Sequence, residues 1–165
     1  MDDNPDDQMF ITKAFRRNGV TNPIHCVGSG DEAIAYLKGE GKFADRLSYA
    51  YPSFITTDLK MPCGDGMSVL EHLRIRPDWS VIPTAVLSGS RDLDDIKTAY
   101  NLGASSYHIK PVATDDLHNL VRILYDYWMT CEVPQVDSTG KQLPTVSSGK
   151  MGERFSSNYL KPSDA

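Results

Sequence analysis

The chain has 165 residues, 40% of them hydrophobic and 24% charged, and its formal net charge is -5 at pH 7. These values indicate one soluble globular domain with a real core, and the acidic balance argues against a nucleic-acid partner. The sequence has no apolar run near the ~20 residues of a membrane span and no signal peptide. Without such a run we expect no membrane partner. Its three cysteines are far apart without a CxxC pair, so we expect free thiols in a reducing compartment, and therefore a cytoplasmic location.

The first predicted element is a helix that begins after Asn4. Asn4 is a favourable N-cap, Pro5 suits the first helical position, and an acidic first turn complements the positive end of the helix. Apolar residues then recur at helical spacing as far as Gly19, a typical C-terminal stop. An apolar run at 24–27 predicts a short strand, and a helix is expected over about 31–37.

Three further apolar runs predict strands at about 53–58, 82–88 and 105–110. Helical patterns follow these runs at about 66–75, 92–102 and 114–129. Strands that alternate with helices pair in parallel through right-handed crossovers, so the pattern predicts an α/β fold. The first two of these strands are largely apolar, as expected where helices cover both faces of a sheet.

The composition changes after about residue 131. Residues 132–165 include several Pro, Ser and Gly residues and few large apolar ones. We therefore predict one domain over 1–131 and a flexible tail over 132–165. The tail is too poor in apolar residues for a second domain, and a partner-binding role for it is the alternative.

The three apolar runs end in polar residues of different chemistry. Asp58 ends the first run, Ser88 the second and Lys110 the third. A parallel sheet brings these ends to the edge where α/β proteins place their sites. An acidic pair, Asp2 and Asp3, opens the chain and can join them. Taken singly, each is an ordinary turn, cap or surface charge, but their joint placement predicts a site.

This set suits a carboxylate that accepts a phosphoryl group. Asp58 can attack phosphorus to form an acyl phosphate, and the repulsion between the two anions calls for a divalent cation. Lys110 supplies a fixed positive charge to the phosphoryl oxygens, and Ser88 supplies a hydroxyl donor.

Magnesium is the cation that we expect, because it binds few carboxylates and keeps several waters. Asp3 and Asp58 each offer one oxygen to it, and the backbone carbonyl of Lys60 offers a third. Asp2 is placed to hold a metal-bound water. A phosphohydrolase with an aspartyl nucleophile is a rival function, but it needs a second acid where this chain has Lys60.

Together these residues resemble the receiver domain of two-component response regulators. The resemblance covers about residues 2–130, with 30 residues from Asp58 to Ser88 and 22 from Ser88 to Lys110. The matching pieces are Asp2-Asp3-Asn4-Pro5, Asp58-Leu59-Lys60-Met61-Pro62, Asp65-Gly66, Ser88-Gly89-Ser90, Gly103-Ala104, Tyr107 and Lys110-Pro111. The connection 39–45 and the ending 125–128 resemble a narrower group, the single-domain receivers that partner phytochrome-type sensor kinases.

The resemblance implies a flavodoxin-like doubly wound parallel sheet in the order 2-1-3-4-5. It also implies that Asp58 is phosphorylated by the phosphohistidine of a sensor histidine kinase, with Mg²⁺ as cofactor. Ser88 and Lys110 then bind the phosphoryl oxygens, and Tyr107 is the switch aromatic that follows the movement of Ser88. Such a protein is a phosphoacceptor switch rather than an enzyme, with at most auto-phosphorylation and dephosphorylation activity, and it signals by protein contact.

One departure from the family concerns the first strand. Only Met1 precedes the acidic pair, so the central strand is missing from this chain, and we expect an N-terminally truncated receiver with a wrongly assigned start. A frayed chain end with a positive amine also weakens Asp2 and Asp3 as metal ligands. The alternative function is therefore a non-phosphorylated receiver-like adaptor. Tyr127 and Trp128 either pack in the core or enter a homodimer contact.

Overall fold

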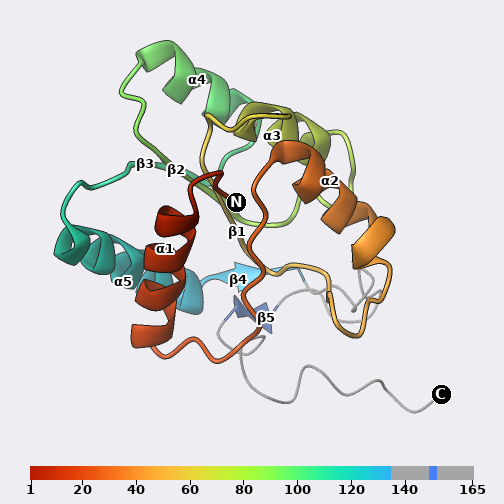
Figure 1. Ribbon diagram of the computed structural model, residues 1–165, viewed down its shortest axis with the longest axis horizontal. Coiled ribbons are helices and arrows are strands. Elements are labelled where there is room, and N and C mark those ends of the chain that lie inside the picture. The colour runs from red at the N-terminus through yellow and green to blue at the C-terminus, as the bar shows by residue number, and fades with distance from the viewer. Residues whose placement is uncertain (135–148, 152–165) are drawn as a thin grey trace.

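The computed structural model describes residues 1–134 and 149–151 (Figure 1). Within this part of the chain, β1 (Ile55–Thr57), β2 (Thr84–Ser88) and β3 (Ser106–Ile109) form a three-stranded parallel sheet in the order β1-β2-β3. Its helices are α1 (Pro5–Arg17), α2 (Gly30–Lys38), α3 (Gly66–Arg74), α4 (Leu93–Asn101) and α5 (Thr114–Thr130), with a 3-10 turn, η1 (Gly41–Phe43). The predicted α/β class is confirmed, and the three strands correspond to the last three of the expected order.

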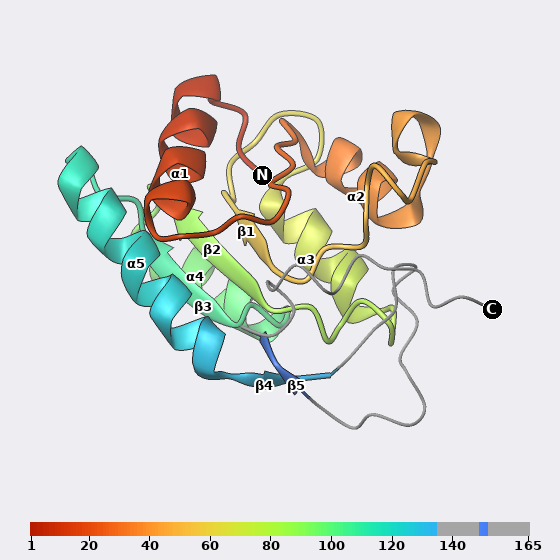
Figure 2. The same cartoon turned by 90° about the horizontal axis from the view of Figure 1, so that it is seen from below.

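The helices lie in two groups around the sheet (Figures 1 and 2). α1 packs against α5, while α3 packs against both α2 and α4. Every residue of the central strand β2 is buried, so its continuous apolar run reflects cover from both sides. The helix starts follow the sequence signals: Asn4 caps α1, with Pro5 as its first residue.

The strand predicted at 24–27 does not form. A strand exists only as a partner in a ladder, and among the described residues no strand lies between this segment and β1. The segment keeps one backbone contact towards the sheet, in which the amide of Asp2 donates to the carbonyl of Val27 at 3.1 Å. An apolar run with no partner strand therefore stays extended but unpaired.

Met1 occupies the open edge of β1. Its amino group donates to the carbonyl of Thr56 at 2.6 Å, and its own carbonyl accepts from the amide of Asp58 at 3.0 Å. This pair of bonds is the pattern of a parallel bridge opposite Thr57. The chain end is therefore held at the sheet rather than frayed, contrary to the expectation from its position.

The region after α5 is only partly described. Glu132–Val133 (β4) pair in antiparallel fashion with Gly149–Lys150 (β5), and the side chain of Met151 is buried. Most of the predicted flexible tail, at 135–148 and 152–165, lies outside the described residues. None of the helices in the described part of the chain has the length and apolar character that crossing a membrane requires.

Candidate functional site: a carboxylate cluster around Lys110

The register of the sheet brings the three polar strand ends to one edge. Thr57 pairs with Val86, and Ser88 pairs with Ile109. Asp58 and Lys110 directly follow their strands, so both emerge at the carboxyl edge beside Ser88. The amide of Lys110 also donates to the carbonyl of Ser88 at 2.9 Å, which fixes the two neighbouring strand ends together.

Asp58 is held through both of its carboxylate oxygens. Its Oδ2 accepts from Nζ of Lys110 at 2.6 Å. Its Oδ1 accepts from the backbone amides of Leu59 at 2.6 Å and Lys60 at 3.3 Å. Charge-assisted bonds of this kind orient a carboxylate firmly, and its side chain retains 12% exposure, which leaves a path for a reacting group.

Lys110 is the centre of the cluster. Its Nζ also donates to Oδ2 of Asp2 at 2.6 Å and to Oδ2 of Asp7 at 3.0 Å. Burial alone would lower the pKa of Lys110, but the hydrogen bonds to Asp2, Asp58 and Asp7 outweigh it and raise the pKa. The side chain is therefore a permanent cation at any physiological pH.

Asp2 is the most buried acid of the cluster, with 2% exposure. Burial raises the pKa of its carboxyl, although the hydrogen bond from Lys110 and the amide of Asn4 act in the opposite direction. Three carboxylates thus share one ammonium, and the cluster carries an excess of negative charge. A second cation would relieve that excess.

The structure brings together some of the predicted residues and adds one. Asp2 and Asp58 both contact Lys110, whereas Asp3 is exposed. Asp7 was missed, because in the sequence it is a favourable charge at the start of a helix. The available signal was its position: the first turn of α1 follows the acidic pair closely and so lies at the same edge of the sheet.

Ser88 and Tyr107 lie on the adjacent strands and both contact Ser90. Ser88 is 1% exposed, and its Oγ accepts from the amide of Ser90 at 3.3 Å. The Tyr107 hydroxyl donates to the carbonyl of Ser90 at 3.0 Å. The short segment after β2 therefore links the predicted hydroxyl donor to the predicted switch aromatic.

A second set of contacts connects this edge to α4. Ser90 Oγ donates to Oδ2 of Asp95 at 2.5 Å. The same carboxylate oxygen lies 3.7 Å from Nζ of Lys60, in the loop that follows Asp58. This outer pair is exposed and weak by itself, but it places α4 next to both loops that border Asp58.

The cluster offers the ligand chemistry of a hard cation without a preformed cage. Carboxylate and carbonyl oxygens are the ligands that magnesium prefers, and the carboxylates of Asp2 and Asp58 both lie at this edge beside Lys110. No group of three or more His, Cys, Asp or Glu side chains within residues 1–134 and 149–151 is arranged to hold a metal ion. Asp2, Asp7 and Asp58 instead each direct one oxygen to the Lys110 ammonium.

Comparison with known proteins identifies the family of the chain. The sequence matches the model of the response regulator receiver domain over residues 1–122. A probable methanogenesis regulatory protein, FilR2 of Methanothrix harundinacea (strain 6Ac), is 33% identical over 132 residues, which cover 78% of this chain and 81% of that protein.

Solved structures of receivers superpose on most of the chain. The structure of the phosphorylated cyanobacterial phytochrome response regulator RcpA has a TM-score of 0.76 and 32% identity, and the match covers 82% of this chain and 95% of that one. The Mn(2+)-bound form of response regulator Rcp1 has a TM-score of 0.74 and 26% identity, over 82% and 96% of the two chains. The protein belongs to the response regulator receiver domain family, and its relatives include single-domain phytochrome response regulators.

Proposed function

We propose that this protein is a phosphorelay receiver that accepts a phosphoryl group on Asp58 from a sensor histidine kinase, of phytochrome type, and signals by protein contact. The observation that carries the proposal is the shared ammonium of Lys110, 2.6 Å from both Asp58 and Asp2. Family membership and the likeness to phytochrome response regulators support it. Its expected place of action is the cytoplasm.

The chemistry is one displacement at phosphorus. An oxygen of Asp58 forms the new O–P bond as the N–P bond of a kinase phosphohistidine breaks, and the imidazole leaves with the electron pair of that bond. Lys110 exchanges one of its carboxylate contacts for a phosphoryl oxygen, while the Ser88 hydroxyl donates to another. The protein is a phosphoacceptor switch in this scheme, with at most auto-phosphorylation and dephosphorylation activity.

A divalent cation fits the same edge, and Mg²⁺ is our choice. Its positive charge would offset the repulsion between Asp58 and the incoming phosphoryl group. Asp3, Asp58 and the carbonyl of Lys60 would hold it directly, with Asp2 behind a water. The exposure of Asp3 keeps one carboxylate available, and the excess negative charge around Lys110 favours a further cation.

Movement of Ser88 would carry the signal to the surface. A phosphoryl group that draws the Ser88 hydroxyl towards Asp58 disturbs the segment through Ser90, to which Tyr107 is bonded. Phosphorylation then favours one arrangement of β3 and α4 through its different contacts with the two states. Tyr107 is the switch residue of this proposal.

Phosphorylation by a small donor tests the proposal. Incubation with acetyl phosphate and Mg²⁺ should add one phosphoryl group, measured by intact mass, and Asp58→Asn should abolish the addition. Asp126→Asn, an isosteric change of an exposed acid on α5, is the matched control and should be labelled like the wild type. Labelling that survives Asp58→Asn would dismiss the assignment.

Two further proposals accompany this function: an alternative function and an oligomeric state. A non-phosphorylated adaptor is the second candidate, favoured by the fact that Asp2, Asp7 and Asp58 already bond to Lys110 and that the described residues contain no preformed metal cage. A homodimer is the second point: Tyr127 is 60% exposed on α5 and packs edge-on against Trp128. Sedimentation with and without acetyl phosphate decides whether self-association accompanies phosphorylation.

A further inference from the structure

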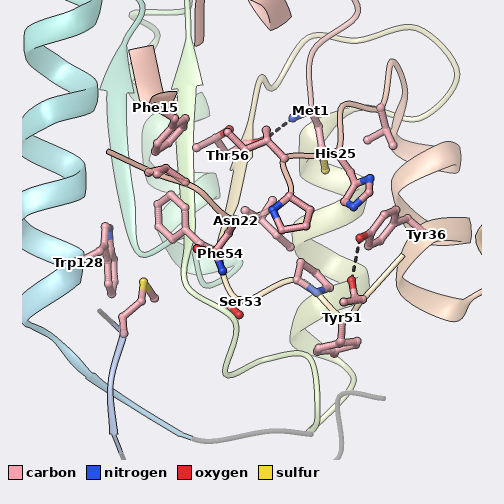
Figure 3. A pocket seen from close by; sticks show the side chains of 18 of the residues that line it. Met1, Phe15, Asn22, His25, Tyr36, Tyr51, Ser53, Phe54, Thr56 and Trp128 are labelled. Atoms are coloured by element: carbon pink, nitrogen blue, oxygen red, sulfur yellow. Dashed lines mark hydrogen bonds between the residues drawn. The ribbon is translucent and has the colours of Figure 1, made fainter. Parts of the chain in front are cut away.

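A cavity of about 270 Å³ lies along the open edge of β1 (Figure 3). Phe54, Ile55 and Thr56 line it on the side of the sheet, and residues from the segment 20–27 line the opposite side. In the flavodoxin-like order 2-1-3-4-5 the first strand runs at this place, between the second and third strands. The cavity is therefore part of the family's fold rather than a separate ligand site.

The Lys110 ammonium, in contrast, is fully used as a hydrogen-bond donor. An ammonium carries three N–H groups. Nζ of Lys110 donates to one carboxylate oxygen each of Asp2 and Asp58 at 2.6 Å, and to one of Asp7 at 3.0 Å. A phosphoryl oxygen on Asp58 therefore finds no free N–H on this lysine. In the proposed transfer, one of the three carboxylates has to give up its contact.

Two of the three carboxylates are anchored by further contacts. Asp2 is buried, and its other oxygen accepts from the amide of Asn4 at 3.1 Å. Asp58 is the proposed phosphoacceptor itself, and its Oδ1 accepts from two backbone amides. Neither carboxylate can leave Lys110 without breaking another hydrogen bond or leaving a buried acceptor unpaired.

Asp7 is the carboxylate that can be released most easily. Its contact with Lys110 is the longest of the three, and its side chain is 36% exposed, against 3% for Asp2 and 12% for Asp58. It lies in the first turn of α1, where the positive end of the helix favours a negative charge without help from the lysine. Water can therefore replace Lys110 beside Asp7 at low cost, whereas it cannot do so beside Asp2.

From these contacts we infer that Asp7 is a positioning residue, which holds the third N–H of Lys110 in the unphosphorylated protein and releases it to a phosphoryl oxygen on Asp58. The inference rests on the proposed function and adds a residue that restrains it. Asp7 occupies the donor that the phosphoryl group needs, and its negative charge repels that group. A neutral side chain at this position should therefore speed the phosphorylation of Asp58.

Rates of labelling by acetyl phosphate test the inference on the full chain. Transfer from this donor forms an O–P bond at Asp58 while the O–P bond to acetate breaks, and acetate leaves with the electron pair. In the presence of Mg²⁺, Asp7→Asn should be labelled about threefold faster than the wild type, the size expected for the loss of one partly exposed ion pair. Asp7→Glu retains the carboxylate and should return the rate towards that of the wild type.

Asp6→Asn is the matched control. Asp6 is an exposed acid in the same helical turn, and the change removes the same formal charge from a residue that does not contact Lys110. This variant should be labelled at close to the wild-type rate, and melting curves verify that each variant is folded. A disturbed fold would slow labelling, so a gain in rate confined to Asp7→Asn separates positioning from a structural effect.

Two results would contradict this role of Asp7 alone. If the wild type is labelled at Asp58 but Asp7→Asn is no faster than Asp6→Asn, the inference is overturned and the proposed function stands. The same holds if Asp7→Glu is labelled as fast as Asp7→Asn, because the carboxylate would then have no effect. If the wild type is not labelled at Asp58, the proposed function fails and the inference fails with it.

Discussion

At the scale of single residues, the protein depends on Lys110. One half-buried ammonium holds Asp2, Asp58 and Asp7 at one edge of the sheet, and burial of Asp2 makes that contact hard to replace by water. The same contact fixes the carboxylate of Asp58, whose oxygens accept from the lysine and from two backbone amides. In the proposed function this contact would orient the oxygen that attacks phosphorus.

Removal of the ammonium should therefore destabilise the fold. Lys110→Met leaves Asp2 and Asp58 without their shared cation, and we expect a loss of about 3–5 kcal/mol in the free energy of unfolding, typical of a broken buried ion pair. Urea denaturation measures it, with Lys13→Met on the exposed side of α1 as the control. Equal stability of the two variants would contradict the claim that the ion pairs of Lys110 stabilise the fold.

His108 gives the fold a dependence on pH. Burial lowers the pKa of His108 below its ordinary value of 6.5, and its Nε2 is buried without a partner. Between the lowered pKa and 6.5 the unfolded chain binds more protons, so stability rises with pH through this window and falls on acidification.

His108→Phe should remove this dependence, because phenylalanine has a similar ring and no proton to gain. We expect the variant to gain stability relative to the wild type as the pH falls below 6.5. Denaturation curves of both proteins at a series of pH values measure the difference. Curves that stay parallel across the series would show that His108 does not contribute.

At the scale of elements, α3 approaches the Asp58 strand end closely. Gly66, the first residue of α3, donates its amide to the carbonyl of Leu59 at 3.0 Å. A Cβ at this position would lie 2.1 Å from the backbone oxygen of Asp58. No side chain fits there without a shift of the helix or of the loop that carries Asp58.

Gly66→Ala should therefore cost stability in spite of alanine's better helix propensity. Overpacking of this kind typically costs about 1–3 kcal/mol, and displacement of Asp58 should slow labelling by acetyl phosphate as well. Gly89→Ala is the control for stability alone, because open space surrounds the Cβ position there. Thermal melts compare the stability of the two variants, and labelling rates compare Gly66→Ala with the wild type. Equal stability of the two variants and an unchanged labelling rate would mean that the loop adapts freely.

The elements also show what the sequence could predict. Strands at β1, β2 and β3 and the five helices were predicted, because their apolar periodicity and caps are local signals. The strand at 24–27 was wrong, since pairing is not local: the same residues would be a strand only with a neighbour. The meeting of Asp2, Asp58 and Lys110 followed from parallel topology, whereas the role of Asp7 needed the orientation of α1.

At the scale of the whole molecule, the carboxylate cluster and the cavity lie along the same strand. Asp58 follows β1 at its carboxyl end, and the open side of β1 forms a wall of the cavity. Met1 joins the two regions, because it bonds to Asp58 through its carbonyl and lines the cavity. The open edge of β1 was expected from the missing apolar run before Asp2, whereas the side chains that line the cavity follow from tertiary packing.

The most direct test of the account is to locate the phosphoryl group. After incubation with acetyl phosphate and Mg²⁺, borohydride reduces an aspartyl phosphate to homoserine, and peptide mass spectrometry identifies the modified residue. The account predicts homoserine at position 58 and no modification of Asp2, Asp3 or Asp7. Homoserine at another position, or none under conditions that label a known receiver, would contradict it.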